Sequence, residues 1–188
     1  RKLYPDLYWG AISSSGVTAA VEHFWEYHEA FRNFAPAGCA DAQEALTSIV
    51  DTILFGGSQD ESDDLKRMFH LDGLQDDEFG HVITGALSGL QSTNWATEDD
   101  EEALSFYCAT ITSTARLFAS TAHLEAKAKY FTKLGGHGDH LEQRAAQLLN
   151  WAGYIRNMDK KAKRSGCKGL TNAECYSNRH VADEPVVS

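Results

Sequence analysis

Long apolar runs and an excess of basic residues are both missing from this sequence of 188 residues. No run approaches the roughly 20 apolar residues that a helix needs to cross a bilayer. The 17 Lys and Arg residues are outnumbered by 27 Asp and Glu residues, which gives a formal net charge of −10. A general nucleic-acid binder is excluded, because binding to a phosphate backbone requires a basic face. We therefore expect neither a membrane nor a nucleic acid as partner.

The signatures of common catalytic and phosphate-binding sites are missing as well. The chain has no Walker loop, no Gly-x-Gly-x-x-Gly after a strand and no His-Glu-x-x-His. The Ser-Ser-Ser-Gly of residues 13–16 lacks the Gly-x-Ser-x-Gly pattern of a nucleophile elbow. Spacing and composition alone predict a globular helical domain with no self-evident active site and no cofactor.

What is present is the composition of a folded protein. Hydrophobic residues make up 43% of the chain and charged residues 23%, which is typical of a globular domain and not of a disordered segment. The length suits one domain with a sizeable core. The chain begins with Arg1 instead of methionine. We therefore expect it to be a piece cut from a longer polypeptide.

Four cysteines are the main covalent signal in the sequence. Cys39, Cys108, Cys167 and Cys175 allow three pairings, and none belongs to the Cys-x-x-Cys pair of a zinc or thioredoxin-like site. We predict the disulfides Cys39–Cys108 and Cys167–Cys175, formed in an oxidising compartment. The alternative is four buried free thiols, which the composition equally allows.

The first 16 residues differ in pattern from the rest. Residues 1–8 resemble the tail of a helix ended by Pro5, and residues 9–16 are small, apolar and uncharged, closed by a glycine. This second stretch predicts a short buried strand. A lone strand is not stable without partners.

The remaining chain is predicted to be almost wholly helical, because apolar residues recur at steps of three and four. Asp41 with Glu44, and Ser58 with Glu61, have the spacing of capping boxes at two helix starts. No convincing period follows Gly166. The predicted helices cover residues 17–35, 41–57, 58–69, 76–90, 98–120, 121–134 and 139–158.

Glycines and charge runs complete this helical pattern. Gly80, Gly85 and Gly89 lower the helix propensity of residues 76–90, so we expect close packing against a neighbour as compensation. The acidic run at 98–102 and the basic cluster at 160–164 suit a helix start and a helix end through the helix dipole. The acidic run lacks the alternating ligands and glycine turn of a calcium loop.

Histidines offer the remaining candidate chemistry. His137 and His140 flank Asp139 in a glycine-rich turn, with His123 upstream. A metal needs three or four converging ligands, and His and Asp commonly serve as turn and N-cap residues, so we favour the turn interpretation and expect no metal site. His23 and His28 are five residues apart, do not share a helix face well, and are interpreted as ordinary helix residues.

The N-terminal segment carries a resemblance to a known family. Residues 3–17 read Leu-Tyr-Pro-Asp-Leu-Tyr-Trp-Gly-Ala-Ile-Ser-Ser-Ser-Gly-Val, residues 20–27 read Ala-Val-Glu-His-Phe-Trp-Glu-Tyr, and Cys39 follows. This stretch resembles the lysosomal Pro-Xaa carboxypeptidase and dipeptidyl peptidase II family of serine peptidases, in particular its secreted fungal members. The resemblance extends more weakly through the helical pattern and Glu-Cys-Tyr-Ser at 174–177. Ser15-Gly16-Val17 departs from the Ser-Ala-Pro of many relatives, and a proline there would stiffen the backbone.

The resemblance implies a division of the chain. Residues 1–16 correspond to a helix end and one core strand of an α/β-hydrolase domain, residues 17–165 to a multi-helix cap inserted in that fold, and residues 166–188 to the segment returning toward the hydrolase domain. The fold class is then mainly α. The Ser-His-Asp triad would lie outside this chain, so no catalytic residue is assigned. Ser14, Ser15 and Gly16 are the candidate rim of the substrate pocket.

The function implied by the resemblance is that of a cap on a proline-specific serine peptidase, which hydrolyses peptide bonds after proline. The chain alone is predicted to be inactive, and its partner is a peptide substrate bound through the parent enzyme. A secreted or vacuolar-lysosomal location and a homodimer are compatible with this resemblance. The alternative is a stand-alone helical binding module without catalytic activity, and a metal-binding helical protein ranks third. Aromatic residues could form apolar walls for a substrate proline or belong to an ordinary core, namely Phe24, Trp25, Phe31, Phe34 and Trp95.

Overall fold

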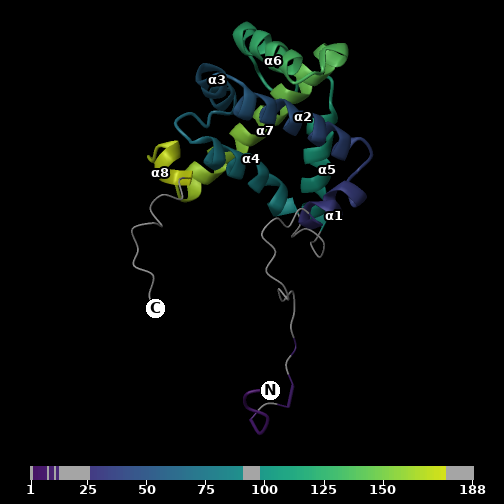
Figure 1. The fold of residues 1–188 in the computed structure, drawn as a ribbon, viewed down its shortest axis with the longest axis vertical. Coiled ribbons are helices and arrows are strands. Elements are labelled where there is room, and N and C mark those ends of the chain that lie inside the picture. The colour runs from purple at the N-terminus through teal and green to yellow at the C-terminus, as the bar shows by residue number, and fades with distance from the viewer. Residues whose placement is uncertain (1, 8, 11, 13–25, 91–97, 177–188) are drawn as a thin grey trace.

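The computed structural model describes residues 2–7, 9–10, 12, 26–90 and 98–176. Within these ranges the chain is built from helices and contains no strand, which confirms the mainly α prediction (Figure 1). No described helix combines the length and the apolar character needed to cross a bilayer. The helices are α1 Glu26–Phe34, α2 Cys39–Gly56, α3 Gln59–Phe69, α4 Asp76–Leu90, α5 Glu98–Thr112, α6 Ala122–Leu134, α7 Leu141–Ser165 and α8 Asn172–Tyr176, with the short 3-10 helix η2 Gly138–His140 before α7.

Helix α7 lies at the centre of the core and packs against α2, α3, α5 and α6. Its Trp151 is almost fully buried and meets the ring of Phe69 edge-on, with ring centroids 5.4 Å apart. Phe69 in turn meets Phe79 of α4 at the same centroid distance and in the same geometry. These edge-to-face contacts join α3, α4 and α7 through one aromatic chain.

Helix α3 has the ends that its sequence predicts. The Ser58 hydroxyl accepts the Glu61 backbone N–H, and the Glu61 carboxylate accepts the Ser58 backbone N–H at 2.7 Å, which confirms this capping box. The helix ends at His70, whose φ of 61° places it in the left-handed region. Leu65, Met68 and Phe69 of this helix are buried.

The start of α2 was predicted two residues too late. The helix begins at Cys39 after Gly38, whose φ is 77°, and Gly38 makes no side-chain cap. The Gly38 carbonyl already accepts the Ala42 N–H at 3.0 Å. Asp41 therefore lies inside the first turn, and the predicted capping box of Asp41 with Glu44 is wrong. The predicted end of this helix at the Gly-Gly pair is confirmed.

The predicted strand over residues 9–16 has no counterpart in the described part of that segment. Trp9 and Ile12 are 96% and 100% exposed, and neither is in a strand. Within the described residues there is no neighbouring strand to pair with, and an unpaired strand cannot satisfy its backbone groups. Residues 13–16 lie outside the described residues.

Helix α5 ends before its predicted end at residue 120, because a side chain far along the chain holds the residues that follow it, and α7 continues to Ser165, beyond its predicted end at residue 158. Helix α5 ends at Thr112, and residues 113–120 form a loop held by Asn150 of α7. The Asn150 amide donates to the Ser113 and Ala115 carbonyls, and its oxygen accepts the Leu117 N–H at 2.9 Å. Helix α8 was missed altogether by the search for apolar periodicity.

Gly80 and Gly85 of α4 do not pack closely against a neighbour, and the surroundings of Gly89 lie outside what the structure describes. A Cβ built on Gly80 or Gly85 would meet no heavy atom within 4 Å, so the expected compensation is wrong at both positions. The close approach occurs elsewhere. A Cβ on Gly153 of α7 would lie 2.3 Å from the Phe118 ring, and one on Gly135 would lie 2.7 Å from Ile49.

Candidate functional site

The predicted rim of a substrate pocket, Ser14, Ser15 and Gly16, lies outside the described residues. The histidine cluster is described, and no group of three His, Cys, Asp or Glu residues suited to a metal occurs within the described ranges. His137 precedes η2, and burial, reinforced by the nearby Arg144 and His140, lowers its pKa. A lowered pKa keeps the imidazole neutral.

A cleft of about 550 Å³ lies between α1, α2 and α4. Phe31 of α1 and Ala40 of α2 contribute apolar surface. Thr84 is the α4 residue that lines it. The remaining lining residues are polar or charged, namely His28, Glu29, Arg32, Gln43, Glu44, Thr47, Ser48, Asp51 and Thr52.

Arg32 ties α1 to α2 across this cleft. Its guanidinium lies 2.7 Å from the Glu44 carboxylate of α2 and 3.4 Å from Glu29, one turn back on α1. More than half of the Arg32 and Glu44 side-chain surface is exposed, so water screens the pair. Helix α1 is also attached through Phe31 and Ala35, which pack against the core. The contacts described here between α1 and the rest of the protein are therefore few and weak.

The α2 wall of the cleft is fixed by covalent and polar links. Cys39 forms a disulfide with Cys108 of α5, as predicted, with 5.1 Å between the Cα atoms. One turn along α2, Gln43 accepts a hydrogen bond from the buried Tyr107 hydroxyl and donates to Thr47 at 3.1 Å. Burial raises the pKa of Tyr107 far above its usual range, so the phenol stays a neutral donor. The position of the α2 wall is thus fixed by its links to α5.

Asp51 stands on the same wall, one helical turn beyond Thr47. Its side chain reaches solvent, yet partial burial by the surrounding helices raises the pKa of its carboxyl. Together with Glu29 and Glu44 it gives the cleft three carboxylates against the single guanidinium of Arg32. The cleft therefore carries an excess of negative charge when its carboxylates are ionised.

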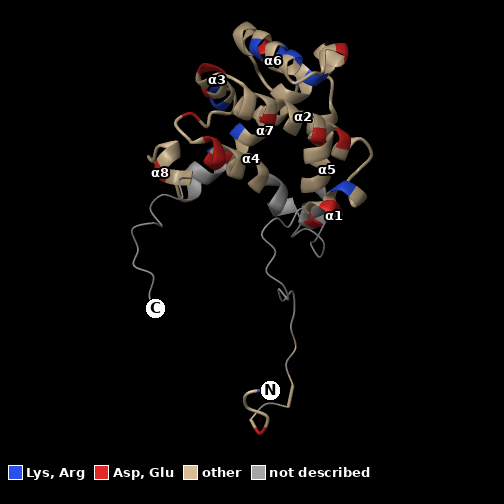
Figure 2. Ribbon diagram, viewed as in Figure 1, with Lys and Arg blue, Asp and Glu red and all other residues tan. Residues whose placement is uncertain are grey.

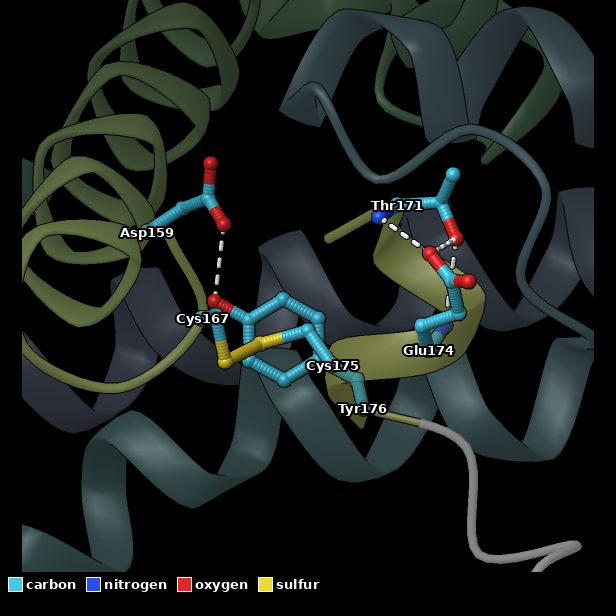
Figure 3. Close-up of a disulfide and its surroundings, with 6 residues drawn as sticks. All are labelled: Asp159, Cys167, Thr171, Glu174, Cys175 and Tyr176. Atoms are coloured by element: carbon cyan, nitrogen blue, oxygen red, sulfur yellow. Dashed lines mark hydrogen bonds between the residues drawn. A yellow bond between two sulfur atoms is a disulfide. The ribbon is translucent and has the colours of Figure 1, made fainter. Parts of the chain in front are cut away.

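A second cleft of about 250 Å³ lies between α4, α7 and α8. Its walls include Val82 and Gly85 of α4, Met158 of α7 and Tyr176 of α8. The Tyr176 hydroxyl donates to Asp159 at 2.7 Å, and burial together with this carboxylate raises the pKa of Tyr176 (Figure 3). Helix α4 therefore borders both clefts, one on the side of α1 and one on the side of α8.

The short helix α8 is held in place by a disulfide and a capping box. Cys167 and Cys175 are bonded as predicted, with 5.5 Å between the Cα atoms (Figure 3). Glu174 accepts the Thr171 backbone N–H at 2.8 Å, and the Thr171 hydroxyl accepts the Glu174 N–H at 3.2 Å. The Thr-x-x-Glu spacing was the sequence signal that could have identified this helix. Asn172 then donates to the His70 and Asp72 carbonyls, both at 3.0 Å.

A third hollow, of about 340 Å³, lies between α3 and α6 and is crossed by polar contacts. The Tyr130 hydroxyl donates to Glu61, and Lys127 pairs with Asp64. The hydrogen bond from Tyr130 is the largest cause of a lowered pKa at Glu61. These contacts are typical of two helices that meet at a solvated surface. They do not place a nucleophile next to a general base.

The described residues thus contain clefts and two disulfides, and none of the contacts given above joins a serine, a histidine and an aspartate as in a catalytic triad. Disulfides of this kind form and persist in oxidising compartments, such as the extracellular space.

Comparison with known proteins points to one class, the serine peptidases. No family model matches the chain, and no solved structure matches it. A probable extracellular serine carboxypeptidase from Arthroderma benhamiae is 37% identical over 179 residues, which cover 95% of this chain and 25% of the relative. The serine protease vicPb from Bipolaris victoriae is 21% identical over 191 residues, covering 98% of this chain and 32% of that protein.

A third relative matches a shorter stretch. The serine protease vicPa, also from Bipolaris victoriae, is 31% identical over 76 residues, or 40% of this chain and 14% of the relative. The chain is therefore similar in sequence to serine peptidases along nearly its whole length. It spans a third or less of the length of these relatives.

Proposed function

We propose that this chain is the helical cap of a secreted, proline-specific serine peptidase, akin to Pro-Xaa carboxypeptidases and dipeptidyl peptidases. The observation that carries the proposal is the match over 95% of the chain to 25% of a probable extracellular serine carboxypeptidase. A helical unit of this size, similar to one quarter of a peptidase, has the extent expected of an inserted domain. The two disulfides suit the secreted location.

In such an enzyme the catalytic part supplies the bond-breaking chemistry. A serine attacks the scissile carbonyl, a histidine takes the serine proton and later gives it to the leaving amine, and an aspartate orients the histidine. The cap would narrow the approach to that serine, admit short or unfolded peptides, and exclude water as the site closes. We assign this role to the cleft between α1, α2 and α4, because it has a volume of about 550 Å³ and combines apolar Phe31 with polar groups.

The test compares this chain with the longer polypeptide encoded by the same reading frame. The longer polypeptide should react with a fluorophosphonate probe and hydrolyse peptides after proline, whereas the 188-residue chain should do neither. Replacing the labelled serine by alanine should abolish both signals. Hydrolysis by the 188-residue chain that survives serine-directed inhibitor controls would overturn the placement of the nucleophile.

Proline specificity needs its own comparison. A prolyl peptide and the matched alanyl peptide, of equal length and charge, should differ at least tenfold in kcat/KM for the longer polypeptide. Equal values would leave a serine peptidase without proline preference and would refute the specificity part of the proposal. If the reading frame is limited to this chain, the peptidase assignment fails and a stand-alone binding module is the remaining interpretation.

A further inference from the structure

Part of α4 differs in charge from α3 and α6, although α4 begins with three acidic residues and the larger cleft beside it carries carboxylates. Helices α3 and α6 carry Lys, Arg, Asp and Glu along their length, visible as blue and red segments in Figure 2. Residues 79–85 of α4 contain none of these four residue types and are tan in the same view. Charged side chains cover surfaces that face water, and their depletion is a property of interface cores.

The surface around residues 79–85 is also incompletely packed. We define the α4 face as His81, Thr84 and Gly85 of α4 together with Met158 of α7. The three α4 residues are exposed, and 41% of Met158 is exposed. Gly85 has open space where a side chain would stand. The clefts of about 550 and 250 Å³ lie on either side of α4, so the face is hollowed along both edges.

The position of α4 relative to the first and last described helices suggests what covers this face. Helix α1 shares the larger cleft with α4, and α8 shares the smaller one. In the relatives, two thirds or more of the polypeptide lies outside the matched region. Figure 1 shows α1 and α8 at the two ends of the same edge of the body, with α4 between them. A catalytic part joined through α1 and α8 would therefore lie against α4.

We propose that the α4 face is the surface by which the helical body docks on the catalytic part of the same polypeptide. This inference rests on the proposed function, because the occupant is the peptidase body. Contacts between domains of one chain usually bury about 600–1,500 Å². Side chains from the catalytic part would enter the two hollows and pack over Gly85, and the charged α3 and α6 side would remain in water.

Amide hydrogen exchange tests the docking without any mutation. Peptides covering residues 79–85 should exchange at least tenfold more slowly in the longer polypeptide than in the 188-residue chain. Peptides covering residues 122–134 of α6 should exchange at the same rate in both. Equal exchange at residues 79–85, or protection confined to α3 and α6, would overturn the proposal.

A pair of charge insertions supplies a second, matched test within the longer polypeptide. Gly85→Glu places a carboxylate on the α4 face, and Ala126→Glu places one on the exposed surface of α6. Gly85→Glu should abolish the tenfold protection of residues 79–85, and Ala126→Glu should leave it unchanged. Retained protection in Gly85→Glu would contradict the proposal. If that variant does not fold, the exchange measurement on the unmodified polypeptide still decides the question.

Failure of docking and failure of the proposed function give different results. Fluorophosphonate labelling with no protection at α4 would refute the docking surface and leave the peptidase assignment in place. Protection at α4 with no labelling would refute the peptidase assignment, and with it the identity of the occupant.

Discussion

The helices fall into two groups that are stabilised differently. Helices α2, α3, α5, α6 and α7 share an apolar core, including fully buried Leu46, Leu65 and Phe131. Helix α4 adds buried Phe79 and Ile83 to this core, whereas α1 and α8 are attached through a few side chains, a disulfide loop and polar links. We expect most of the folding free energy to lie in the core helices, because burial of apolar surface is the main favourable contribution to folding. Helices α1, α4 and α8 complete the clefts. The substitutions below test this division, from the largest expected effect to the smallest.

The two disulfides should differ in their contribution to stability. Cys39 and Cys108 are separated by 69 positions, and Cys167 and Cys175 by 8. Loop-closure entropy predicts that replacing Cys39 and Cys108 by alanine lowers the free energy of unfolding by ~4 kcal/mol, against ~2.5 kcal/mol for the other pair. Guanidinium denaturation of the two double variants measures this difference. A larger loss from the Cys167 and Cys175 variant would contradict the assignment of α8 to the outer group.

One ion pair between α3 and α4 should contribute to the stability of the protein. Lys66 is almost fully buried, and its ammonium lies 2.7 Å from Asp76, which also accepts a hydrogen bond from Ser62. Asp76→Asn leaves a buried ammonium without its carboxylate and should cost about 2 kcal/mol, less than for a fully buried pair because Asp76 is half exposed. Asp77→Asn, on the exposed neighbour, serves as the control and should cost little.

The same pair predicts a dependence on pH. The hydrogen bond from Lys66 is the largest cause that lowers the pKa of Asp76 below its ordinary value of 3.8. The stabilising contribution of the ionised Asp76 carboxylate is therefore present above pH 3.8. It is lost as the pH falls through the lower pKa that Asp76 has in the folded protein. The stability difference between wild type and Asp76→Asn should shrink below about pH 4. A difference that stays constant from pH 6 to pH 3 would contradict this role.

Two glycine substitutions should change the stability of the protein in opposite directions. Gly153→Ala puts a methyl group against the Phe118 ring and should destabilise the protein by about 1–3 kcal/mol through overpacking. Gly85→Ala meets open space within a helix and should stabilise it by about 0.5–1 kcal/mol. Thermal melts of the two variants measure the signs. Destabilisation by Gly85→Ala would show that α4 is more tightly packed than the structure indicates.

The smallest effect is expected at the attachment of α1. Arg32→Gln removes an exposed ion pair and should lower the free energy of unfolding by under about 1 kcal/mol. Lys129→Gln removes a similarly exposed pair with Glu142 and is the matched control. Amide exchange should accelerate at residues 26–34 in the first variant alone. A loss of several kcal/mol in Arg32→Gln would place α1 in the core group.

Local signals explain what the sequence could predict. Ser58 and Glu61 are three residues apart, so their capping box and the start of α3 follow from chemistry within one turn. The C-terminal end of α5 and the position of α8 depend on Asn150 and Asn172, whose partners lie 33 or more residues away. The larger cleft requires α1, α2 and α4 to come together, which no periodicity reveals. The predicted pocket rim at 14–16 remains untested.

The separation of the cysteines also bears on the order of events during synthesis. Cys39 and Cys108 both leave the ribosome before Cys167, so their bond can close while the last part of the chain is still being made. Among the four cysteines of this chain, Cys167 then has Cys175 as its remaining partner, eight positions away. Vectorial synthesis therefore favours the native pairing among the three pairings that these four cysteines allow.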